Sequence, residues 1–90
     1  MHDDSVSVGD VLEVIADFEA LEPAGVSSGL IAWELRQRER TVQPLIEAAQ
    51  QDELIALSGW DEDRGEQLWK LTDAGRDHLE SMTSSRGEHG

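Results

Sequence analysis

Apolar residues at helical spacing mark the first element of the chain. They recur every three or four positions, and most of the acids between them fall on the other side. The members of this stripe are Val8, Val11, Leu12, Ile15 and Phe18. Ser7 and Asp10 form a capping box at its start, and Pro23 and Gly25 are expected to end it. The pattern predicts an amphipathic helix that begins directly after Ser7.

A second and a third helix are predicted between residues 26 and 51. Val26 is expected to form a short edge strand, and Ser27 or Ser28 to cap the second helix. The core faces of the two helices are Ile31, Ala32 and Leu35, and then Val42, Leu45, Ile46 and Ala49. The run from Arg36 to Arg40 is expected to form the turn between them. Thr41 is predicted to cap the third helix, which would place Pro44 in its first turn, where a missing N–H is tolerated.

The C-terminal half of the chain predicts a hairpin followed by a helix. Leu54–Leu57 is a short apolar run typical of a strand, and residues 58–66 are expected to form a loop. The segment 67–71 alternates, so Trp69 and Leu71 would share a buried face. The following helix would be capped by Thr72 and anchored by Leu79 and Met82. The expected organisation is a disordered leader over residues 1–6, one domain over 7–82 and a disordered tail over 83–90.

This order of elements resembles the winged helix-turn-helix proteins, especially their MarR/PadR-like branch, over about residues 8–82. The resemblance is carried by the strand at Leu54-Ile55 and by the phrase Leu71-Thr72-Asp73-Ala74-Gly75-Arg76 after the hairpin. In this phrase the leucine fills the core, the threonine caps the next helix and the glycine permits close packing. The resemblance implies an α+β fold with a three-helix core, a two-stranded wing and a C-terminal helix.

Charge is distributed unevenly along this acidic chain, which has a formal net charge of −13. Residues 1–25 carry seven acids and no base, and residues 52–90 carry ten acids and four bases. Residues 26–51 are neutral, with three glutamates and three arginines. A negative surface repels phosphate at long range. The acidity is therefore consistent either with a high-salt cytoplasm or with a role in binding protein.

The resemblance implies a small DNA-binding transcriptional regulator in which residues 41–51 enter the major groove. Arg36, Arg38 and Arg40 would contact phosphates at the start of this helix. The residues expected to face the bases are Thr41, Gln43 and Glu47. Gln43 would bond an adenine edge, whereas Glu47 would repel phosphate unless it accepts from a cytosine amine. Arg64, at the wing tip, would reach the minor groove or a flanking phosphate.

Each of these assignments has a simpler alternative. The three arginines would pair with neighbouring glutamates, and Arg64 would be neutralised by the acids around it: Asp61, Glu62, Asp63 and Glu66. Leu30 and Trp33 lie off the core face of their helix and would form an apolar partner interface or a dimer seam. The alternative is that they pack beneath the last helix. Trp60 is expected to cover the base of the hairpin.

No motif for catalysis, metal binding or cofactor binding is found in the sequence. The chain has no cysteine, and its three histidines lack ligand spacing. No apolar run is long enough to span a bilayer, and the N-terminus does not resemble a signal peptide, so a cytoplasmic protein is expected. We do not expect an enzyme. The alternative to a dimeric DNA-binding regulator is a winged helix that binds a protein partner.

Overall fold

The first helix begins where its capping box predicts. The computed structural model describes residues 6–87, and within it α1 spans Val8–Phe18. The backbone N–H of Ser7 donates to Oδ2 of Asp10 at 2.9 Å, and the N–H of Asp10 donates to the carbonyl of Ser7 at 3.0 Å. The helix ends at Phe18, before Pro23 and Gly25. The N–H groups of Leu21 and Glu22 both donate to the carbonyl of Phe18, which forms a turn in place of a further helical turn.

The remaining elements follow in the predicted order and confirm the α+β winged helix-turn-helix fold. They are β1 (Val26–Ser27), α2 (Ser28–Leu35), α3 (Glu39–Gln51), β2 (Ile55–Asp61), β3 (Glu66–Leu71) and α4 (Asp73–Gly87). The short strand at Val26 is present and pairs with β3. The helix α4 runs through residues 83–87, which the sequence assigned to the tail. Residues 1–5 of the expected leader and 88–90 of the expected tail lie outside the described residues.

A single apolar core joins the three N-terminal helices to the sheet. Its fully buried side chains come from α1, α2, α3 and all three strands: Trp69, Leu12, Ile15, Ile31, Ile46, Ile55, Val11, Val26 and Val42. Trp69 is the largest of them, and its indole Nε1–H donates to Oγ of Ser28 at 3.1 Å, so the ring is buried without losing its polar partner. Trp69 and Leu71 share the buried face that the alternation predicted.

The sheet is antiparallel in the order β1-β3-β2, and its two long strands form the wing. Pairing continues to Asp61 and Glu66, so the turn at the wing tip covers only residues 62–65. The expected loop over residues 58–66 was therefore too long, and Trp60 belongs to β2. The reason is a β-bulge between Leu57 and Gly59, which absorbs Ser58 and lets the ladder resume.

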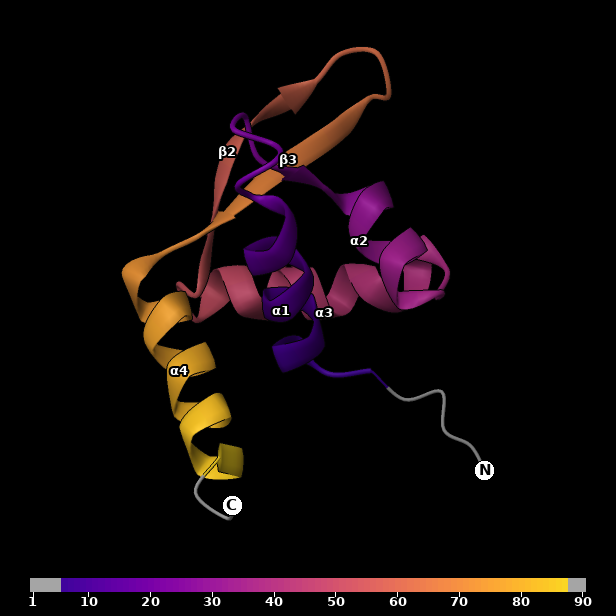
Figure 1. Cartoon of the computed structure of the whole chain (residues 1–90). Coiled ribbons are helices and arrows are strands. Elements are labelled where there is room, and N and C mark those ends of the chain that lie inside the picture. Colours follow the sequence, from indigo (N-terminus) through magenta and orange to yellow (C-terminus); the bar gives the residue numbers. More distant parts are fainter. Residues whose placement is uncertain (1–5, 88–90) are drawn as a thin grey trace.

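The wing and α4 extend from opposite ends of the sheet. Figure 1 shows the hairpin projecting beyond the helices, while α4 leaves from the other end of β3. Thr72 caps α4 by accepting from the N–H of Gly75 at 3.1 Å, as the sequence predicted. Gly75 packs so closely that a Cβ there would lie 2.0 Å from the carbonyl oxygen of Leu54. No helix within the described residues is long and apolar enough to cross a membrane.

Candidate nucleic-acid interface

The turn between α2 and α3 is shorter than the sequence suggested. Arg36 adopts a left-handed conformation with φ 58°, and the N–H of Gln37 donates to the carbonyl of Ala32 at 3.0 Å. This closes α2 by a Schellman-type arrangement, although an arginine takes the position usually held by glycine. The third helix then begins at Glu39 with Arg38 as its N-cap. The prediction that Thr41 is the N-cap was wrong, because the tight turn brings the chain into helical geometry three residues earlier.

The earlier start changes the position of Pro44. It lies in the sixth position of α3, so it is beyond the first turn and inside the helix. The N–H that a different residue would supply at position 44 would have bonded the carbonyl of Arg40. The explanation that Pro44 is tolerated in the first turn was therefore wrong. A proline in a helix interior costs roughly 3 kcal/mol relative to alanine.

The helix α3 has one buried and one exposed side. Val42, Ile46 and Ala49 are buried, as predicted, whereas Leu45 is only half-buried and packs against the edge of the core. Of the residues expected to face the bases, Thr41 and Glu47 are exposed and Gln43 is half-buried. The amide Nε2 of Gln43 donates to Oε2 of Glu47 at 3.4 Å, which joins these two side chains along the helix.

The N-terminal end of α3 differs from those of the other described helices. The N-caps of α1, α2 and α4 are Ser7, Ser27 and Thr72, each of which carries a side-chain oxygen. In α3 the N-cap is Arg38, whose side chain can donate but cannot accept. The first N–H groups of this helix therefore receive no cap from Arg38, and the positive end of its dipole coincides with cationic side chains.

The arginines around this helix end are exposed and do not form the local pairs considered from the sequence. Arg36, Arg38 and Arg40 are all exposed. Among the described residues, the ion pairs join Arg64 to Asp61 and Arg76 to Glu19, and none involves these three arginines. Three exposed arginines, which we call the arginine cluster, thus lie within five positions of a helix end that has no side-chain cap and one acid, Glu39, in its first turn. An exposed helix N-terminus flanked by cationic side chains is suited to binding an anion.

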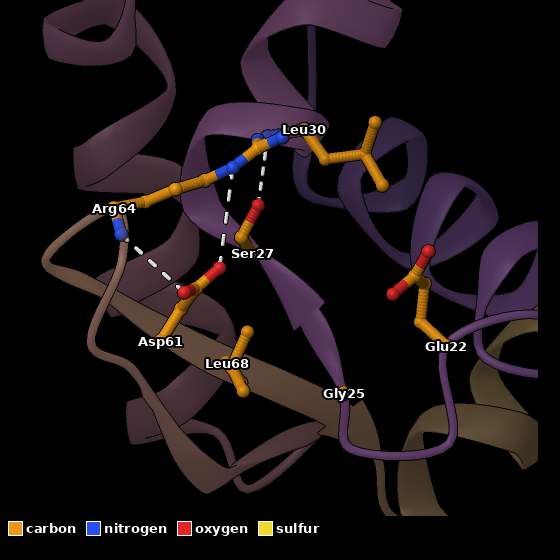
Figure 2. A pocket seen from close by; sticks show the side chains of 7 residues that line it. All are labelled: Glu22, Gly25, Ser27, Leu30, Asp61, Arg64 and Leu68. Atoms are coloured by element: carbon orange, nitrogen blue, oxygen red, sulfur yellow. Dashed lines mark hydrogen bonds and ion pairs between the residues drawn. The ribbon is translucent and has the colours of Figure 1, made fainter.

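The wing residue Arg64 is less available. Its Nε lies 4.0 Å from Oδ2 of Asp61, and its backbone N–H donates to Oδ1 of the same residue at 3.3 Å. Figure 2 shows the side chain directed back toward Ser27 and Leu30 at the start of α2, beside a hollow of about 190 Å³. Arg64 therefore does not join the arginine cluster at α3, and Asp61 offsets part of its charge.

The carboxylate of Glu66 has a role that sequence reasoning missed. It was counted only among the acids around Arg64, but it accepts a hydrogen bond from the N–H of Gly29 at 3.1 Å. Together with Ser27, which accepts from the N–H of Leu30 at 3.1 Å, it provides partners for two of the first N–H groups of α2. Nothing local in the sequence signals this contact, because the two residues are 37 positions apart.

The expected apolar patch consists mainly of Trp33. Its side chain is 74% exposed, whereas Leu30 is half-buried and packs against the core. Trp33 lies beside an open hollow of about 510 Å³ that is also lined by Glu34, Arg36 and Gln37. Leu57 and Trp60 in β2 are also more than half exposed. The structure therefore leaves the side chain of Trp33 exposed, in a hollow that it shares with Arg36.

Comparison with solved structures gives the class of fold. No protein-family model matches the sequence, and no curated protein matches it. MepR of Staphylococcus aureus bound to ethidium bromide superposes with a TM-score of 0.74 at 21% identity, covering 99% of this chain and 59% of MepR. The MepR–DNA complex gives a TM-score of 0.69 at 24% identity, covering 91% of this chain and 56% of MepR. The chain thus spans little more than half the length of these proteins.

These similarities establish a MarR-like winged helix-turn-helix fold. MepR itself is described as a transcription regulator of the S. aureus multidrug efflux pump MepA. At this level of identity the likeness concerns the fold, and the function of this chain has to be argued from its own residues. Among the described residues, no cluster of histidine and carboxylate side chains could hold a metal ion.

Proposed function

We propose that this protein is a DNA-binding transcriptional regulator whose helix α3 enters the major groove. The observation that carries the proposal is the N-terminal end of α3, where Arg38 replaces an oxygen-bearing cap and two further exposed arginines, Arg36 and Arg40, lie nearby. An uncapped helix N-terminus with cationic side chains suits a backbone phosphate. MepR, which shares this fold, has been solved in complex with DNA.

Phosphate contacts at this end would set the position of α3 against the bases. The helix would then present Thr41 and Glu47 to the groove, with Gln43 held against Glu47. Arg64 would contact a flanking phosphate from the wing, with a smaller contribution because Asp61 already pairs with it. A single module of this size covers little DNA, so a homodimer on two half-sites in the cytoplasm is the form we propose.

The test is a gel shift with mixed genomic DNA fragments. Arg38→Ala and Arg40→Ala should each weaken binding to all sequences alike, because a lost phosphate contact carries no sequence preference. Arg76→Ala is the matched control, since it removes the same charge from α4, where Arg76 pairs with Glu19. The proposal would be contradicted if the wild-type chain bound no DNA at every salt concentration tested. It would also be contradicted if all three variants lost affinity equally.

A second candidate function is binding to a protein partner without DNA. It is favoured by one observation, the 74% exposure of Trp33, which lines a surface hollow. Exposed apolar surface of this kind often marks a site of protein interaction. In this case Leu30 and Trp33 would belong to the partner interface. Sedimentation of the purified chain at increasing concentration, with Trp33→Ala beside it, tests the simplest version, in which the partner is a second copy. A monomer at all concentrations would contradict that version.

A further inference from the structure

The outward stripe of α3 consists of four residues. With 3.6 residues per turn, Arg40, Pro44, Glu47 and Gln51 fall within about 60° of one another around the helix, opposite the buried residues Val42, Ile46 and Ala49. All four stripe residues are exposed. Thr41 and Gln43 lie to either side of this stripe. A helix that enters a groove with its buried side toward the core would therefore place Pro44 and Glu47 at the centre of contact.

Pro44 can recognise only one feature of the major groove. Its side chain neither donates nor accepts a hydrogen bond, and the apolar group displayed in this groove is the C5-methyl of thymine. Its presence in a helix interior weakens α3, since the carbonyl of Arg40 loses the donor from position 44. Because Pro44 is exposed, it makes no core contact that would compensate for this loss. A destabilising residue at the centre of a contact face points to a role in binding.

Glu47 can likewise recognise few features. An ionised carboxylate only accepts hydrogen bonds, so it requires an amine on the base edge. Cytosine presents its N4 amine without a neighbouring acceptor, whereas adenine places the N7 acceptor beside its amine and guanine presents acceptors only. Oε2 of Glu47 is held by Nε2 of Gln43 at 3.4 Å, which leaves Oε1 to accept from the DNA. Guanine or thymine opposite Glu47 would be repelled.

We propose that α3 selects its site through a thymine methyl contacted by Pro44 and a cytosine amine bound by Glu47. The two residues are one turn apart, about 4.5 Å along the helix, which suits bases one or two steps apart. Much of the selectivity then comes from exclusion, because a wrong base leaves Glu47 facing an acceptor. This inference rests on the proposed DNA-binding function and specifies which bases that site takes.

The experiment begins with selection from a random-sequence duplex pool by the wild-type chain, followed by binding measurements on the selected duplex. Each thymine is then replaced in turn by uracil, which lacks only the methyl group. Loss of one buried methyl should weaken wild-type binding about threefold to fivefold at a single position. The variant Pro44→Ser should bind the thymine and uracil duplexes equally. In the same assay, Glu47→Gln should change the preferred base from cytosine to adenine, by roughly tenfold.

The outcomes separate this inference from the proposed function. A uracil effect that persists unchanged in Pro44→Ser, or a cytosine preference unchanged in Glu47→Gln, overturns the inference. Selection that yields no enriched sequence, while Arg38→Ala still weakens binding, also overturns it but leaves DNA binding intact. Failure of the wild-type chain to bind any duplex overturns the proposed function as well. Circular dichroism and thermal unfolding of each variant verify that α3 remains folded.

Discussion

Glu66 accepts a hydrogen bond from the backbone N–H of Gly29 at 3.1 Å, and this contact ties the start of β3 to the N-terminus of α2. A Cβ at position 29 would come within 2.5 Å of Oε2 of Glu66, so the absence of a side chain allows the carboxylate to approach. The negative charge also complements the positive end of the α2 dipole. Because α2 leads directly into α3, this hydrogen bond helps to fix the orientation of the wing relative to α3.

Removal of this carboxylate should affect both stability and DNA binding. We expect Glu66→Ala to lower the free energy of unfolding by about 1 to 2 kcal/mol, because it removes the hydrogen-bond partner of the N–H of Gly29. It should also weaken DNA binding, since the wing is less firmly held. Urea unfolding and the gel shift measure the two effects. Glu62→Ala, in the turn of the wing, is the control of equal charge, and equal losses in both variants would contradict the assigned role.

Gly75 should be far less replaceable than Gly29. A Cβ at position 75 would lie 2.0 Å from the carbonyl oxygen of Leu54, which is backbone and cannot move aside, whereas at position 29 it would meet the end of a flexible side chain. We expect Gly75→Ala to destabilise the domain by more than about 2 kcal/mol. For Gly29→Ala the cost should be smaller, because alanine favours the helix by about 1 kcal/mol. Thermal unfolding of the two variants compares them directly, and the reverse order would be inconsistent with this packing.

Replacement of Pro44 should stabilise the protein. Pro44→Ala restores the N–H that can bond the carbonyl of Arg40, and we expect a gain of about 1 to 3 kcal/mol in the free energy of unfolding. Gln50→Ala, at an exposed position of the same helix, should change stability by less than about 0.5 kcal/mol. Chemical denaturation provides both values. A destabilised Pro44→Ala would show that the proline supports the fold, which would remove one argument for its role in base selection.

The tryptophans should separate into one that supports the fold and one that does not. Trp69 is 2% exposed and Trp33 is 74% exposed. Trp69→Ala should cost about 3 to 5 kcal/mol, whereas Trp33→Ala should change stability by less than about 0.5 kcal/mol. Denaturant unfolding followed by circular dichroism makes the comparison without depending on tryptophan fluorescence. If Trp33→Ala unfolded the domain, the side chain would have to be covered in solution.

The salt dependence of DNA binding should reflect the opposition between a local cationic site and a chain of net charge −13. At low salt the long-range repulsion is unscreened, and it weakens as the Debye length falls to about 10 Å at 0.1 M. At higher salt, counterion release at about three phosphate contacts per protomer, hence about six in the proposed dimer, gives a slope of log affinity against log salt near −5. Affinity measured from 0.01 to 1 M should therefore be flat or rising before it falls. A steep decline from the lowest salt would indicate many more phosphate contacts than the arginine cluster provides.

The arginine cluster shows how far the sequence could define the site. The neutral balance of residues 26–51 located the candidate interface, and Arg36, Arg38 and Arg40 are indeed exposed and unpaired with other described residues. The start of α3 could not be predicted, because Arg36 takes a left-handed conformation for which the sequence offers no glycine. The pairing of Arg64 with a neighbouring acid was one of the two interpretations that the sequence offered, whereas the direction of its side chain toward α2 depends on how the wing folds.

The sequence by itself determined the order of elements, their buried stripes and the caps at Ser7 and Thr72, because these depend on interactions between residues within one or two turns. The close packing at Gly75 was also recognisable, from the phrase around it. Only the tertiary structure decided the length of the wing, the exposure of Trp33 and the bond between Gly29 and Glu66. The length of the wing depends on strand register, and the bond between Gly29 and Glu66 joins residues 37 positions apart. A local sequence pattern does not specify which distant residues will be in contact.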